Sequence, residues 1–161
     1  MQRFWVCLVL AGCAATAAPA PRVASLPAGD VMSVDGQHAS LKAALAGSVA
    51  VVDLWATWCT ACEHERPKLE RLHAAYAARG LRVVGLNVGE APGVVSAYLL
   101  EQRIAYPVYL DPDFRLADAL GEKKLPTILV IDREGHIAHR SAGLDSEALA
   151  EVKRLLAQPG P

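Results

Sequence analysis

The sequence predicts a single α/β domain whose central sheet is mixed and flanked by helices. Two features predict this class. Strand-length apolar runs alternate with segments of helical periodicity, and the last run is followed by a tight turn and one more strand. The 161 residues suffice for one domain with a substantial core. Positive and negative charges are interspersed and sum to −1 at pH 7, which disfavours nucleic-acid binding.

The chain begins with a segment typical of protein export. Arg3 is followed by an apolar run over residues 4–10 and then by small residues, a pattern too short to span a bilayer as a helix. Residues 10–13, Leu-Ala-Gly-Cys, resemble the bacterial lipobox, in which cleavage leaves a lipid-bearing cysteine at the new N-terminus. We therefore expect a lipoprotein signal peptide over residues 1–12 and lipidation of Cys13.

An alternative to lipidation stays open, namely a plain signal peptide cleaved within residues 14–20, with Cys13 incidental. Residues 13–29 are rich in alanine and proline, and we expect them to tether a folded domain over residues 30–158. Ala14 after the cysteine favours the outer membrane over the inner one in lipoproteins of two-membrane bacteria. The expected location is therefore the bacterial cell envelope, facing the periplasm.

Strands and helices alternate along the folded part of the chain. A short strand pair is expected over residues 31–41, around an Asp-Gly turn. The later apolar runs lack polar alternation, as in strands buried on both faces of a sheet. They cover residues 48–56, 81–89, 106–111 and 125–132, with a hairpin partner at residues 136–143. Helices are expected at residues 60–79, 91–104 and 112–121, and after Asp145.

Cys59 and Cys62 are the main candidates for chemistry. At positions i and i+3 of a helix, their sulfur atoms lie on one face and can approach bonding distance. If the helix begins at Cys59, free backbone N–H groups and the helix dipole favour its thiolate, the nucleophile of disulfide exchange. Cys62, one turn further on, is then shielded and suited to resolving a mixed disulfide.

Metal-binding and purely structural roles fit the cysteine pair less well. A structural zinc site needs four ligands, and His64 points to a different side of the helix from Cys62. A structural disulfide that closes so small a loop removes little entropy from the unfolded chain. Two reduced thiols buried outside the cytoplasm are unusual. Redox exchange is therefore the preferred interpretation.

Residues 53–67 resemble the active-site segment of the thioredoxin superfamily. The matching positions are Trp55, Trp58, Cys59, Cys62 and Pro67. Residues 124–132, "KLPTILVID", resemble the second signature of that superfamily, in which a cis-proline faces the cysteines. This resemblance implies a thioredoxin-like fold in which Cys59 and Cys62 form a redox disulfide. It further implies that Cys59 attacks the substrate disulfide and that Cys62 resolves the intermediate.

Within the superfamily the chain is similar to the TlpA/ResA-like branch of extracytoplasmic thiol-disulfide oxidoreductases. The similarity rests on the anchored N-terminus, on an extra helix-strand-helix between Pro92 and Gly121, and on the ending "LPTILVIDREGHI" at residues 125–137. It implies a thioredoxin-like fold with that insertion and with an N-terminal strand pair. The residues between the cysteines, Thr60 and Ala61, depart from the proline-containing pairs common in this branch.

Two further residues are expected in the site. Asp53 lies in an apolar strand, where burial should raise its pKa and let it accept or donate the proton of Cys62. Thioredoxin itself carries a buried acid at this position, although a carboxyl that only binds backbone amides is the alternative. Pro126 stands at the start of a strand, and the resemblance implies a cis bond. With Leu125 and Trp58 it would dock an extended substrate segment.

The function expected from these features is that of a membrane-tethered thiol-disulfide oxidoreductase, with the reductase direction favoured. The resemblance implies extracytoplasmic protein disulfides as substrates, apocytochrome c among them, and hence a role in cytochrome c maturation. It also implies a membrane thiol transporter as electron donor, and neither a dissociable cofactor nor a metal is required. A Sco-like copper chaperone using Cys59 and Cys62 is the alternative. That family spaces its cysteines by three residues and adds a distant histidine ligand, for which no histidine here stands in an obviously matching place and His139 is the one to test. A peroxide-reducing relative would need a threonine-plus-cysteine arrangement that we do not find.

Overall fold

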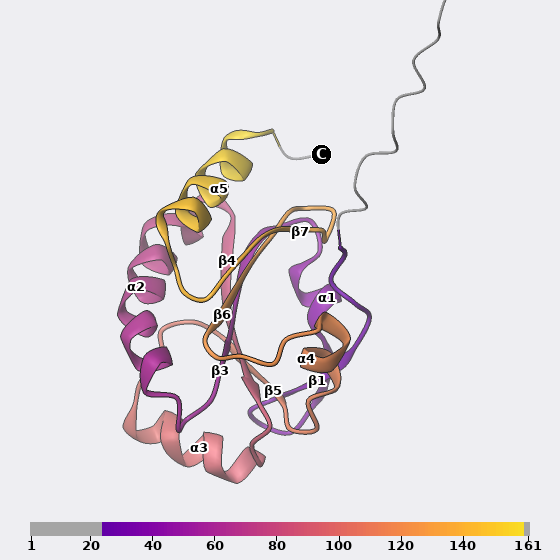
Figure 1. Ribbon diagram of the computed structural model, residues 1–161, viewed down its shortest axis with the longest axis vertical. Helices are drawn as coiled ribbons and strands as arrows, with labels where there is room; N and C mark the ends of the chain where they lie inside the picture. The colour runs from indigo at the N-terminus through magenta and orange to yellow at the C-terminus, as the bar shows by residue number, and fades with distance from the viewer. Residues whose placement is uncertain (1–23, 160–161) are drawn as a thin grey trace, which may run out of the picture.

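The computed structural model describes residues 24–159, which form one seven-stranded mixed sheet with helices on both faces (Figure 1). The strand order is β2-β1-β5-β4-β3-β6-β7. The strands are β1 (Asp30–Ser33), β2 (His38–Ser40), β3 (Val49–Trp55), β4 (Leu81–Val88), β5 (Val108–Asp111), β6 (Thr127–Ile131) and β7 (Ile137–Ser141). The helices are α1 (Leu41–Leu45), α2 (Thr60–Tyr76), the 3-10 helix η1 (Ala77–Arg79), α3 (Pro92–Glu101), α4 (Arg115–Leu120) and α5 (Ser146–Ala157).

The observed sheet confirms the predicted fold class. Strands β3, β4 and β5 are parallel at its centre, and β3 is buried along its whole length. Antiparallel strands flank this centre on both sides: β6 and β7 beyond β3, and β1 and β2 beyond β5. The hairpin expected over residues 125–143 is observed as β6 and β7. Strand β6 runs antiparallel to β3 because α4 has only six residues, so the chain re-enters the sheet at the same end at which β5 finishes.

Two hydrophobic layers hold the helices on the sheet. One layer contains buried side chains of α1 and α4, and the other contains those of α2 and α5. Helix α3 instead covers the end of the sheet at which β3 and β4 finish (Figure 1). Helix α1 is not predicted from the sequence, because five residues are too few to show a helical period. The Ser40 side chain stabilises its start by accepting a hydrogen bond from the amide of Ala43.

The first described residues already pack on the domain, before the expected boundary at Asp30. The amide of Leu26 donates to the carbonyl of Gly135, and the Leu26 side chain is fully buried in the core. Ala24 accepts a hydrogen bond from the amide of Ile137 at the start of β7. The expected signal peptide, Cys13 and the remainder of the tether lie outside the described residues. Between residues 24 and 159, no helix is both long and apolar enough to cross a bilayer.

Candidate active site

A disulfide joins Cys59 and Cys62 at the start of α2. The chain leaves β3 at Trp55 and turns tightly, with the amide of Cys59 donating to the carbonyl of Ala56. Cys59 is therefore the N-cap residue, and its sulfur accepts a hydrogen bond of 3.2 Å from the amide of Cys62. This position exposes the Cys59 sulfur to free amides and to the positive end of the helix dipole, which stabilise a thiolate.

The residues expected to bind substrate lie beside this disulfide. The Leu125–Pro126 bond is cis, and Leu125 packs against the hydrophobic cluster that contains both cysteines. Trp58 is 69% exposed. Trp58 and Leu125 line one pocket of about 390 Å³ together with Phe114 from the inserted segment, and charged side chains, Lys123 and Lys124 among them, also line it. The structure therefore brings Trp58 and Leu125 to one concave surface.

Phe114 in this pocket requires a glycine opposite it. Its backbone has a φ of 59°, unusual for a residue with a side chain. A Cβ added to Gly89 would overlap the Phe114 ring. Gly89, itself at a φ of 74°, therefore lets the aromatic ring lie directly against the backbone at the end of β4.

Asp53 is buried in β3, and one of its carboxylate oxygens, Oδ1, has no hydrogen-bond partner among the described residues. Burial raises its pKa from the ordinary 3.8 to about 7; the nearby Glu65 carboxylate adds to the rise, and the Tyr106 hydroxyl acts in the opposite direction. Asp53 and Cys62 line the same small cavity, which has a volume of about 10 Å³. The geometry therefore places a carboxyl that can titrate near neutral pH next to the inner cysteine.

Glu65 is a charged residue near the site that sequence reasoning missed. It lies on the buried side of α2 and accepts hydrogen bonds of 2.8 Å from the amide of Leu144 and from the ammonium of Lys68. A Cβ on Gly143 would lie 3.0 Å from its Oε1, so the close approach of that loop depends on glycine. The signal for Glu65 was its position four residues before Leu69, on the apolar face of the helix.

Glu90 was also missed, and it holds the turn that presents the cysteines. Its carboxylate accepts hydrogen bonds from the Thr57 amide at 2.7 Å, the Thr57 hydroxyl at 2.5 Å and the Asn87 side-chain amide at 2.7 Å. Thr57 directly precedes Trp58 and Cys59. The available signal was positional, since Asn87 and Glu90 lie at and just beyond the carboxyl end of β4, next to the end of β3.

The remaining predicted residues lie as follows. Pro67 is inside α2, and His139 is in β7 with its Nε2 3.6 Å from Asp145. Among the described residues, one group of three or more side chains could hold a metal, namely Asp132, Glu134 and His136. Neither cysteine belongs to this group, so the copper-chaperone alternative gains no support from the arrangement of the side chains.

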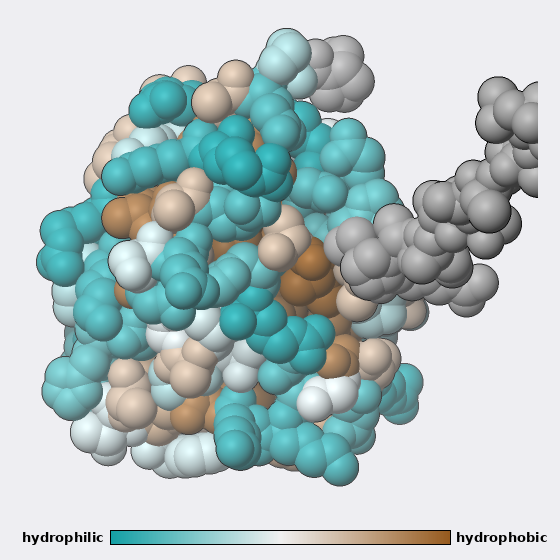
Figure 2. Space-filling view, turned by 45° about the horizontal axis from the view of Figure 1, so that its top comes forward, coloured by the Kyte–Doolittle hydropathy of each residue, from teal (hydrophilic) through white to brown (hydrophobic). Residues whose placement is uncertain are grey.

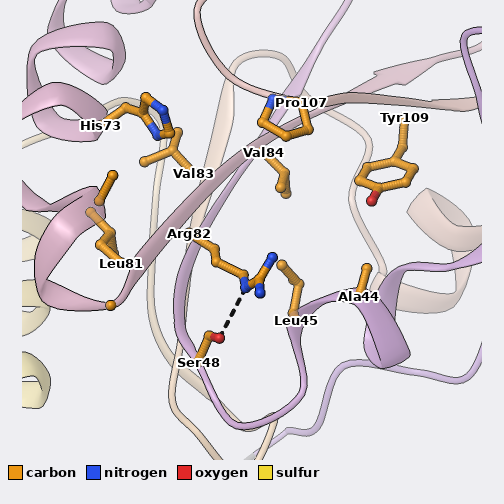
Figure 3. Close-up of a pocket in the computed structure, with 12 residues that line it drawn as sticks. Ala44, Leu45, Ser48, His73, Leu81, Arg82, Val83, Val84, Pro107 and Tyr109 are labelled. Carbon is orange, nitrogen blue, oxygen red and sulfur yellow. Dashed lines mark hydrogen bonds between the residues drawn. The ribbon is translucent and has the colours of Figure 1, made fainter.

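A second pocket, of about 330 Å³, lies at the start of β4 (Figure 3). Arg82 crosses it and donates a 3.0 Å hydrogen bond from Nε to the hydroxyl of Ser48, while Tyr109 lines the opposite wall. The cysteines lie instead beyond the carboxyl ends of β3 and β4. None of the predicted site residues lines this second pocket.

Comparisons with known proteins bear on the family to which the chain belongs. The model of the AhpC/TSA family matches residues 17–140. The thiol-disulfide oxidoreductase ResA of Halalkalibacterium halodurans is 27% identical over 126 residues, which are 78% of this chain and 71% of that protein. ResA of Bacillus subtilis is 29% identical over 116 residues; the match covers 72% of this chain but only 65% of that protein, just under two thirds.

A solved structure of higher identity covers the domain more completely. It is a thiol:disulfide interchange protein of the thioredoxin family from Chlorobium tepidum, which is 32% identical and superimposes with a TM-score of 0.70. The match covers 86% of this chain and 99% of that one. The chain thus belongs to the AhpC/TSA family and is a thioredoxin-like thiol-disulfide oxidoreductase of the ResA type.

Proposed function

We propose that the protein reduces disulfides of proteins outside the cytoplasm. The observation that carries this proposal is the different setting of the two cysteines. Cys59 caps the helix next to the exposed Trp58, whereas Cys62 lines the internal cavity that also contains the buried Asp53. The outer sulfur is thus placed to meet a substrate, and the inner one to complete the exchange in a site that also holds a proton acceptor.

The proposed reaction starts from the reduced pair. The Cys59 thiolate attacks a substrate disulfide, forms a mixed disulfide and releases the first substrate thiolate, which takes a proton from solvent. Cys62 then gives its proton to the Asp53 carboxylate, and its thiolate attacks the Cys59 sulfur. The second substrate sulfur leaves as a thiolate, which takes a proton from solvent, and the Cys59–Cys62 disulfide remains. A carboxyl with a pKa of about 7 can both accept and release that proton at neutral pH.

The substrate is proposed to lie along the cis Leu125–Pro126 bond and against Trp58. Trp58 and Leu125 share a pocket that is lined by both apolar and charged side chains, and the backbone of Leu125 is available for pairing with an extended segment. Apocytochrome c as substrate, a role in cytochrome c maturation and a membrane thiol transporter as electron donor are further parts of the proposal. They rest on the likeness to the TlpA/ResA-like branch.

A lipid anchor at Cys13, following a signal peptide over residues 1–12, is proposed to hold the domain at the outer membrane. The described chain starts at Ala24, paired with the first residue of β7. Because β6 and β7 form an antiparallel hairpin, this end of the sheet is opposite the end that carries the disulfide (Figure 1). A tether leading to Ala24 would therefore leave the cysteines facing away from the membrane.

The surface at that opposite end fits a tethered domain. Figure 2 shows it as mostly hydrophilic, with apolar side chains in smaller patches. Radioactive palmitate should label the wild-type protein in a bacterial host, and Cys13→Ala should abolish the label. An unlabelled wild type would refute the anchor without affecting the redox proposal.

Trapping tests the exchange itself. In Cys62→Ser the mixed disulfide on Cys59 cannot be resolved, so substrates should remain attached and be released by dithiothreitol. The matched variant Cys59→Ser should trap far less, because Cys62 lines the internal cavity with Asp53, whereas Cys59 caps the helix next to the exposed Trp58. The direction is checked with reduced protein and a model protein disulfide. Failure to reduce it, together with oxidation of a reduced model peptide by the disulfide form, would reverse the proposed direction.

A further inference from the structure

The small cavity beside the cysteines has an unusual lining. It is bounded by Asp53 and Trp55 from β3 and by Cys62 from α2, and Tyr106 from the loop before β5 closes another side. The carboxyl Oδ1 of Asp53 and the indole N–H of Trp55 are both buried without a hydrogen-bond partner in the described part of the chain. A volume of about 10 Å³ is close to the minimum that holds one water molecule.

The outer wall of this cavity is formed by two half-buried side chains from different helices, Arg66 of α2 and Tyr98 of α3. Arg66 Nη1 donates a 2.8 Å hydrogen bond to the Tyr98 hydroxyl, and its Nη2 donates one of 3.2 Å to Gln102. Its guanidinium lies 5.9 Å from the centre of the Tyr98 ring. That ring packs on Trp55, with the two centroids 5.5 Å apart.

We propose that Arg66 and Tyr98 form a lid over this cavity, and that Asp53 exchanges its proton with solvent through the cavity when the lid opens. The proposal rests on the proposed function, because Asp53 accepts one proton from Cys62 in each turnover and must lose it before the next. With a single water in the cavity, that proton passes to the water and from there to bulk solvent. Arg66 and Tyr98 are thus positioning residues, and neither touches the substrate.

The surroundings of Asp53 explain why access matters. The charged and titratable groups around it are Glu63, Glu65 and Arg66 from α2, Tyr98 from α3, Tyr106 from the loop and Cys62 itself. Glu65 accepts hydrogen bonds from the Lys68 ammonium and from the amide of Leu144, which lies just before α5. Neighbouring strands present Gly85 and Ile128 opposite Asp53, and neither can carry a proton. Among the described residues, the polar way out of the cavity is therefore the side lined by Glu63, Arg66 and Tyr98, where the Arg66–Tyr98 hydrogen bond closes it.

The test uses the oxidised protein without substrate, so its result does not depend on whether exchange occurs. Nuclear magnetic resonance follows the titration of the Asp53 carboxyl carbon and the hydrogen exchange of the Trp55 indole N–H. Tyr98→Ala removes the lid ring, so water should enter, exchange should become several-fold faster, and the Asp53 midpoint should fall by about one pH unit. Tyr98→Phe keeps the ring and removes the hydroxyl, so only the exchange should accelerate.

Tyr109→Ala serves as the control, because Tyr109 is a half-buried tyrosine that lines the other pocket. It should change neither signal. If Tyr98→Ala does not fold, Arg66→Gln replaces it and should accelerate Trp55 exchange as Tyr98→Phe does. Unchanged exchange and midpoint in folded lid variants would overturn the lid. Trapping by Cys62→Ser would be unaffected by that outcome, so the two proposals fail separately.

Discussion

Two aspartates are buried at the functional end of the sheet, and they differ in how their oxygens are satisfied. Asp111, at the end of β5, accepts hydrogen bonds through Oδ2 from the amides of Leu116 at 3.0 Å and Ala117 at 2.9 Å. Asp53, in β3, leaves Oδ1 without a partner among the described residues. A buried carboxylate that caps a helix stabilises structure, whereas one with an unpartnered oxygen can change its protonation state at a lower cost.

The largest effect that separates the two aspartates is expected on the rate of exchange. Asp53→Asn keeps the shape of the side chain but removes the proton acceptor, so resolution by Cys62 near pH 7 should slow by roughly 10²-fold. Asp111→Asn should leave this rate within about twofold of wild type, because it acts only on α4. Stopped-flow measurement of substrate release from a preformed mixed disulfide checks both variants. Equal rates for wild type and Asp53→Asn would remove Asp53 from the reaction.

The second effect concerns stability as a function of pH. The folded protein holds Asp53 at a pKa of about 7, above its ordinary 3.8, so folding favours the protonated carboxyl. Its contribution is therefore fully present below about pH 4 and declines as pH rises to about 7, by roughly 1.4 kcal/mol for each pH unit between the two values.

Asp53→Asn, which cannot ionise, should lack this decline and be more stable than wild type at neutral pH. Urea unfolding of the two oxidised proteins at several pH values measures the difference. A constant difference between pH 4 and pH 8 would mean that Asp53 is not protonated preferentially in the folded state. The same series on Asp111→Asn is the control.

The third effect belongs to Asp111. Asp111→Ala leaves the amides of Leu116 and Ala117 buried without an acceptor, which should cost roughly 1–3 kcal/mol of unfolding free energy. Asp111→Asn should restore part of this, because its side-chain oxygen can still accept a hydrogen bond. Asp113→Ala, at an exposed neighbouring position, should change stability little. A loss no larger in Asp111→Ala than in Asp113→Ala would show that the cap contributes nothing.

Sequence reasoning found the residues that are unusual where they stand. An acid in an apolar strand and a proline at the start of a strand are unusual for their positions, so Asp53 and Pro126 can be predicted as site residues from the local sequence. Glu65 and Glu90 did not, because acids on helices and in loops are ordinary. Their roles depend on Leu144, 79 residues after Glu65, and on Thr57, 33 residues before Glu90, and no local pattern encodes such contacts. The orientation of β6 is likewise not encoded by a local pattern, since it depends on the end at which the chain re-enters the sheet.

The smallest effect is expected at Glu90. Its variant tests whether this residue only positions the turn that presents the cysteines or also takes part in proton transfer. Glu90→Gln keeps one acceptor oxygen but loses the charge that receives two donors of Thr57. The turn between Trp55 and Cys59 should loosen. Exchange should then slow by only a few-fold, and equally at every pH, because no proton passes through Glu90. Glu101→Gln, at an exposed position of α3, is the matched control. If the exchange rate of Glu90→Gln depended on pH differently from that of wild type, Glu90 would instead be, like Asp53, a group that titrates during the reaction.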